Sequence, residues 1–182
     1  MRFFTTLIIA ALLAIGYGPA FAGNIKYQEV KWGALIPKDW NPAKSLKDLK
    51  FDKLSDADPN AMEALDKMRD AWNAAPVEPS LNGKHIRISG FAVPLEHSHE
   101  LVTEFLLVPY FGACIHSPPP PANQIIHVFL AKPGKKIQTF DTLWVSGTLE
   151  IAHSRAENEF GIGNAAYRLK AEDIAPYVKP KR

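Results

Sequence analysis

The pattern that most restricts the fold is an alternation of apolar and polar side chains after residue 82. In its clearest stretch Leu143, Val145, Leu149 and Ile151 share one face, as in a strand with one side in a core. Strand patterns of this kind occur in five segments, at 84–95, 101–109, 124–131, 142–151 and 164–169. They predict a mainly β fold.

Turn and bend residues around these segments indicate how the strands are arranged. Asn82-Gly83 is a strong turn signal before the first strand. Gly90 and Gly147 lie where strongly bent strands need glycine. We therefore predict a small OB-like β-barrel.

The residues before the barrel predict an arm and one amphipathic helix. Asp58 is suited to cap a helix whose first residue is Pro59. Apolar residues then recur at helical spacing up to residue 74, and we expect this stripe to be a packing surface: Met62, Leu65, Met68 and Trp72. The predicted organisation is a signal peptide at 1–22, an arm and helix at 23–81 and a β-barrel domain at 82–182, the last two forming one compact domain.

The first 22 residues have the order of a secretory signal. Arg2 precedes an apolar run from Leu7 to Ile15, and Ala20-Phe21-Ala22 is a small-x-small cleavage site. An uncleaved membrane anchor is the alternative, but Gly16, Gly18 and Pro19 interrupt the run. We predict cleavage after Ala22, a periplasmic product, and no stable membrane insertion after cleavage.

The charge of the chain is close to balanced. It has 21 Lys and Arg against 19 Asp and Glu, a formal net charge of +2 at pH 7. The one basic run of note is Lys179-Pro180-Lys181-Arg182, which is typical of a solvated terminus. A nucleic-acid partner is therefore not expected.

Cys114 and His116 carry the most chemical information. Cys114 is the only cysteine, so the chain has no internal disulfide. In an extended segment both side chains point to the same side. Three interpretations stay open: a buried small thiol beside a loop histidine, a pair of zinc or copper ligands, and a nucleophile with its base. The second would be completed by side chains from Glu96, His97, His99 or Glu100.

The other histidines have less specific surroundings. His127 lies inside an apolar strand pattern and is expected to have its polar tip satisfied. His153 continues the face of Leu143 and is expected at the mouth of the barrel. His85 alternates onto the polar face. We predict none of these three as a metal ligand.

Two motifs resemble those of a known family. They are Gly-Phe-Ala-Val-Pro-Leu-Glu at 90–96, and the stretch at 104–116 that ends in Gly-Ala-Cys-Ile-His and is followed by Pro118 to Pro121 and Asn123. They resemble an uncharacterised family of exported bacterial domains, some of which accompany ATP-driven transporters in zinc-related gene neighbourhoods. The resemblance implies Glu96, Cys114 and His116 as motif positions and favours metal binding.

The sequence thus predicts a periplasmic metal-binding or metal-handling accessory protein. Its ligands would be Glu96, Cys114 and His116, with His97 or His99 as a fourth, its metal zinc or alternatively copper, and its partners components of an inner-membrane ABC transporter. Binding is favoured over catalysis because no full set of acid, base and nucleophile is evident. The rival predictions are a thiol-dependent enzyme using the Cys-His pair and a structural partner-binding module.

Overall fold

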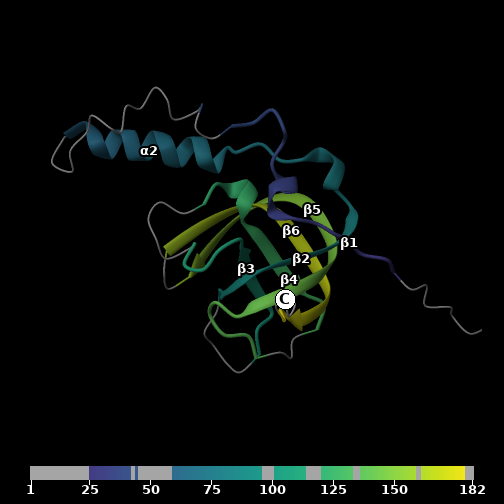
Figure 1. Ribbon diagram of the computed structural model, residues 1–182. Coiled ribbons are helices and arrows are strands. Elements are labelled where there is room, and N and C mark those ends of the chain that lie inside the picture. Colours follow the sequence, from purple (N-terminus) through teal and green to yellow (C-terminus); the bar gives the residue numbers. More distant parts are fainter. Residues whose placement is uncertain are drawn as a thin grey trace, which may run out of the picture.

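Five strands close into a ring in the computed structural model, which describes residues 25–41, 44, 59–95, 101–113, 120–132, 136–158 and 161–178. They are β2 (Lys84–Pro94), β3 (Glu104–Val108), β4 (Ile126–Leu130), β5 (Thr142–Asn158) and β6 (Gly161–Pro176). Strands pair in the order β2-β3-β4-β6-β5, and β5 pairs back with β2. β4 and β6 are parallel, and the other pairs in the ring are antiparallel. The prediction of a mainly β fold is confirmed (Figure 1).

The ring surrounds the larger of two hydrophobic cores. Each strand contributes at least one side chain with no exposed surface, for example Ile88, Phe105, Val128, Val145 and Leu169. Burying one such side chain contributes roughly 1.5–3 kcal/mol. The alternation that predicts the strands is therefore the alternation that fills this core.

A second core lies on the outer side of β3. Leu106 stands between Phe105 and Leu107 of the first core, so its side chain points to the opposite face. We call the buried group around it the outer cluster; it consists of Val93, Leu106, Val108, Ala113, Ile125, Ala156 and Ala165. A Cβ added at Gly163 would lie 2.8 Å from Leu106 Cδ1. The distal part of the β5–β6 hairpin therefore packs on the outer face of β3.

That hairpin is longer than the sequence predicts. The expected strands at 142–151 and 164–169 extend to 158 in β5 and over 161–176 in β6. The pairing shifts register between Ile151 and Ser154, and this irregularity breaks the two-residue period. His153 is consequently exposed on the hairpin, and the expectation that it continues the face of Leu143 is wrong.

The N-terminal segment is attached to the ring by strand pairing and hydrogen bonds. β1 (Gln28–Glu29) pairs in parallel with β2, and the short helix η1 (Trp32–Leu35) follows. The indole Nε1 of Trp32 donates to the carbonyl of Ser89 at 2.7 Å. Tyr167, from β6, donates its hydroxyl to the Leu35 carbonyl at 2.8 Å. These contacts agree with the predicted arm.

The helix α2 (Pro59–Asn73) confirms the predicted helix to within one residue. It lies outside the ring, beyond one end of it (Figure 1). Met68 is only 7% exposed, but Met62 is 65% exposed and Leu65 37%. The expectation that the whole apolar stripe is a packing surface is therefore wrong for Met62 and Leu65, whose side chains are exposed. The proposed cap, Asp58, lies outside the described residues.

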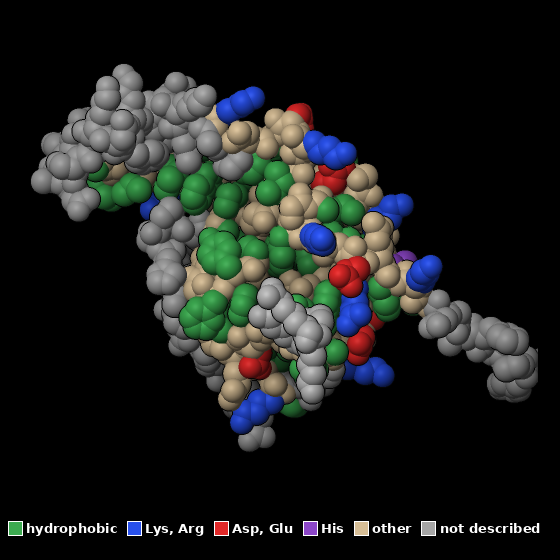
Figure 2. Space-filling model, in the orientation of Figure 1, with side chains coloured by type: hydrophobic (Ala, Val, Ile, Leu, Met, Phe, Trp, Pro, Cys, Tyr) green, Lys and Arg blue, Asp and Glu red, His purple; other side chains and the backbone are tan. Residues whose placement is uncertain are grey.

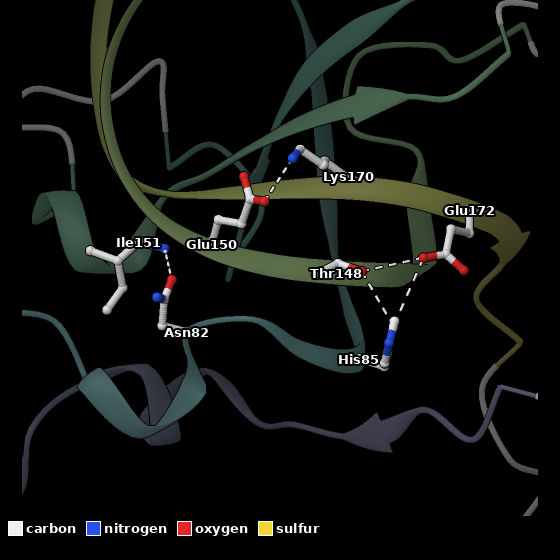
Figure 3. Close-up of polar contacts among 7 residues, drawn as sticks. All are labelled: Asn82, His85, Thr148, Glu150, Ile151, Lys170 and Glu172. Atoms are coloured by element: carbon white, nitrogen blue, oxygen red, sulfur yellow. Dashed lines mark hydrogen bonds and ion pairs between the residues drawn. The ribbon is translucent and has the colours of Figure 1, made fainter.

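Two further short helices connect the elements, η4 (Pro79–Leu81) and η5 (Ala122–Gln124). The turn after η4 is tied to β5, since the Asn82 Oδ1 accepts a hydrogen bond from the Ile151 amide at 2.8 Å (Figure 3). On the same surface Glu172 lies 3.3 Å from the hydroxyl of Thr148 and 3.9 Å from His85 Nδ1 (Figure 3). His85 is on the polar face, as predicted.

Candidate functional site

All the predicted metal ligands fall outside the described residues. Glu96, His97, His99 and Glu100 belong to the connection between β2 and β3. Cys114 and His116 belong to the connection between β3 and η5. The described residues that flank them are Leu95 and Leu101, and Ala113 and Pro120.

The flanks of the two connections share one hydrophobic patch. Leu95, directly before Glu96, packs against the outer cluster. Ala113, directly before Cys114, is 1% exposed and is a member of that cluster. Both segments that carry predicted ligands thus begin on the outer side of β3.

The same side of the sheet holds a buried polar chain of three side chains. His127 pairs with Leu106 in the β3–β4 register and is only 7% exposed. Its Nε2 lies 3.1 Å from Glu104 Oε2, and its Nδ1 lies 3.0 Å from Ser154 Oγ. Glu104, His127 and Ser154 come from β3, β4 and β5, so the arrangement is produced by the closure of the fold.

The protonation of the hydrogen-bonded chain Glu104–His127–Ser154 follows from the chemistry of its groups. An ionised carboxylate can only accept, so the His127 Nε2 carries the hydrogen and donates it to Glu104. The Nδ1 is then the acceptor that faces the Ser154 hydroxyl. Burial lowers the pKa of His127 below its ordinary 6.5, Glu104 acts in the opposite direction, and Arg168 adds to the lowering. The imidazole is therefore neutral at pH 7.

Ser154 links the hydrogen-bonded chain Glu104–His127–Ser154 to solvent, because it also lines a pocket. The pocket has a volume of about 230 Å³ and is lined by Asn73, His153, Ser154, Arg155, Asn164 and Ala165. The Asn164 Nδ2 donates to the Asn73 Oδ1 at 2.9 Å, which joins α2 to the β5–β6 hairpin at the pocket wall. One residue that lines this pocket is thus a serine that contacts a neutral, oriented histidine.

Two features are absent from the described part of the chain. No three His, Cys, Asp or Glu side chains among the described residues are grouped so as to hold a metal ion. No described helix has the length and apolarity that a membrane span requires. The metal prediction therefore depends on the connections at 96–100 and 114–119.

One face of the molecule shows how its charges are distributed. Lys and Arg side chains alternate there with Asp and Glu around an apolar centre (Figure 2). Nucleic-acid-binding surfaces usually gather Lys and Arg in one patch or stripe. The described residues on this face form no such stripe.

The sequence predicts part of the buried hydrogen-bonded chain Glu104–His127–Ser154. The expectation that His127 has its polar tip satisfied is confirmed by its two hydrogen bonds. Glu104 and Ser154 were not predicted, because they are 23 and 27 residues from His127 and no local spacing connects the three. The pairing of β3 with β4 and the register shift in β5 bring them together.

The class of fold is a ring of five strands, with the outer cluster buried on one side and an added N-terminal arm. Residues 32–176 match the family model described as a protein of unknown function, DUF3299. The chain belongs to the DUF3299 family.

The solved structures that are similar to this chain include the following two. A DUF3299 family protein from Pseudomonas aeruginosa PAO1 is 34% identical, with a TM-score of 0.62, over 86% of this chain and 99% of that one. A small single-stranded DNA-binding protein from Streptomyces coelicolor is 13% identical, with a TM-score of 0.31, over 53% of this chain and 96% of that one. The second likeness is too distant to support any argument. No curated protein matches the chain.

The family match confirms the resemblance to an uncharacterised family. The motifs at 90–96 and 104–116, the export of the chain and its association with zinc-related transporters stay predictions.

Proposed function

We propose that this protein is an exported accessory protein that binds a transition metal, zinc in the first place and copper as the alternative. Cys114 supplies a thiolate, His116 an imidazole and Glu96 a carboxylate, and His97 or His99 supplies a fourth ligand. Sulfur and nitrogen donors with one carboxylate are a set that Zn²⁺ accepts.

One observation carries this proposal. Leu95 and Ala113, the residues directly before Glu96 and Cys114, pack against the same outer cluster. Two described positions far apart in the sequence, each directly before a predicted ligand, thus contact one cluster, and this supports a single site.

A further part of the proposal concerns the type of fold that the ring of strands belongs to. We propose that β2 to β6 form an OB-like β-barrel. The closed order of five strands, with a parallel pairing between the third and the fifth of them, supports this fold. In such a barrel the described residues directly before the two predicted ligand segments, Leu95 and Ala113, follow the ends of β2 and β3.

The cellular role is a further part of the proposal. The signal-like order of residues 2 to 22 favours delivery to the periplasm. The partner is then a component of an inner-membrane ABC transporter that exchanges metal with this protein.

The test is a calorimetric titration of metal-free mature protein with Zn²⁺, alongside thiol alkylation of Cys114. Cys114→Ala, His116→Ala and Glu96→Gln are expected to weaken binding at least about tenfold each, since each removes a ligand. His85→Ala is the matched control, because it removes an exposed histidine on the opposite, polar face. Bound Zn²⁺ is expected to protect Cys114 from alkylation.

Two results would contradict the metal proposal. Absence of any heat of binding together with unprotected Cys114, for both Zn²⁺ and copper, would end it. A thiol that is reactive without metal, and less reactive in His116→Ala, would instead support the thiol-dependent enzyme.

A further inference from the structure

The chain Glu104–His127–Ser154 has the order of groups that activates a serine nucleophile. Its two contacts, 3.1 Å and 3.0 Å, lie within the reach of hydrogen bonds between nucleophile, base and orienting group. The carboxylate fixes the imidazole in the tautomer whose free nitrogen faces the hydroxyl. The base is thus already oriented and unprotonated.

Local backbone structure presents Ser154 to the pocket. The register shift between Ile151 and Ser154 interrupts the regular alternation of β5 at this point. Irregularities of this kind redirect side chains and are frequent next to active sites. Ser154 consequently contacts His127 on one side and lines the pocket on the other.

The pocket has the size and polarity for a small substrate. Its volume of about 230 Å³ is below the roughly 300–1,000 Å³ that drug-sized ligands need. Arg155 and the side-chain amides of Asn73 and Asn164 line it and are among the groups able to donate to a developing oxyanion. A short acyl group such as acetyl fits these limits.

We propose that Ser154, His127 and Glu104 form a serine esterase site for short-chain acyl esters. Ser154 Oγ attacks the ester carbonyl carbon while His127 Nδ1 takes the hydroxyl proton. The bond to the alcohol oxygen breaks, and His127 gives its proton to the leaving alkoxide. Water, deprotonated by His127, then attacks the acyl-serine, releases the carboxylic acid and restores the Ser154 hydroxyl.

In this reaction Ser154 and His127 are catalytic residues, whereas Glu104 is a positioning residue. It acts through the imidazole by holding its tautomer and stabilising the imidazolium that forms. The site uses neither Cys114 nor a metal, so it is independent of the proposed metal function.

The direct test is labelling of the wild-type protein with a fluorophosphonate probe, followed by peptide mapping. The label is expected on Ser154, in folded protein only. Labelling of Cys114 instead, or no labelling above that of the denatured protein, would overturn the proposal. This readout needs no variant and therefore does not depend on how any substitution folds.

Hydrolysis of p-nitrophenyl acetate gives the kinetic test. Ser154→Ala and His127→Gln are expected to lower kcat/KM at least about a hundredfold, the usual contribution of base and nucleophile. Ser146→Ala, a buried serine of the same strand without contact to His127, is expected to keep the wild-type value. Equal activity in Ser154→Ala and wild type would overturn the proposal.

Two further measurements test the positioning role of Glu104 and whether hydrolysis depends on a metal. For wild type, kcat/KM is expected to rise with pH up to the His127 pKa and to be flat above about pH 6.5, with Glu104 and Arg168 as the neighbouring charges. Glu104→Gln is expected to lower kcat and displace this profile, which a merely structural role would not do. EDTA is expected to have no effect; hydrolysis that requires Zn²⁺ would overturn the serine mechanism and leave the metal proposal standing.

Discussion

The Tyr167 hydroxyl donates a hydrogen bond to the Leu35 carbonyl at 2.8 Å, across 132 residues of sequence. The same oxygen accepts from the Glu78 amide at 2.6 Å. Tyr167 has no exposed surface, and its burial raises its pKa above 10.0. One buried, neutral hydroxyl of β6 therefore fixes both η1 and the segment before η4 to the ring.

We predict that Tyr167→Phe lowers the free energy of unfolding by about 2–3 kcal/mol. The substitution keeps the ring but leaves a carbonyl and an amide without their partner, and each such group costs about 1–3 kcal/mol when buried. Tyr27→Phe is the matched control. Its hydroxyl also donates at 2.7 Å, to Glu172, but at an exposed position, so we expect a loss below about 1 kcal/mol. Urea denaturation measures both, and equal losses would contradict the role of burial.

The second prediction concerns a close approach of β5 to β6 at Gly147. A Cβ at Gly147 would overlap the Lys170 carbonyl oxygen and lie 2.9 Å from Ala171 Cα. Both neighbours are backbone, which cannot move without breaking the pairing. Gly147→Ala is expected to cost about 3 kcal/mol or more. Gly33→Ala, whose Cβ would meet nothing within 4 Å, is expected to change stability by less than about 0.5 kcal/mol. Thermal melts that move alike for the two variants would refute this account.

The strands are predictable from the sequence where one face meets the core. Leu143, Val145 and Leu149 alternate in the sequence and are buried in the structure. The distal part of the hairpin, before residue 164, was missed because Ala156 is small and the register shift after Ile151 breaks the period. Its burial depends on contact with Leu106, which no local pattern contains.

The residues of the candidate sites also differ in how far the sequence alone predicts them. The prediction for Cys114 and His116 rests on two positions separated only by Ile115, since a thiol and an imidazole in one short segment have few roles, and it stays a prediction because both lie outside the described residues. Glu104, His127 and Ser154 have ordinary neighbours in the sequence and acquire a role only when three strands meet. Their arrangement therefore depends on strand pairing between distant segments, which no local sequence pattern shows.

The third prediction is a pH dependence of stability due to His127. Burial is the largest influence on this residue and lowers its folded-state pKa below 6.5, so the unfolded chain binds the proton first as pH falls. The stabilisation is thus present above about pH 6.5 and is lost as pH falls below it, at up to about 1.4 kcal/mol per pH unit. In His127→Gln the free energy of unfolding is expected to vary less between pH 7 and 5. Parallel curves for the two proteins would contradict this assignment.

The last prediction concerns export. Arg2, the apolar run from Leu7 to Ile15 and the small residues Ala20 and Ala22 predict cleavage after Ala22. Intact-mass measurement of periplasmic material is expected to give a chain that begins at Gly23. Ala22→Trp is expected to block processing, because a bulky side chain replaces a small residue at the cleavage site, and the protein should then stay full-length with the membrane fraction. Ala10→Leu is the matched control, since it keeps the apolar run and leaves the cleavage site intact. Full-length wild-type protein in the membrane fraction would show that the segment is an anchor instead.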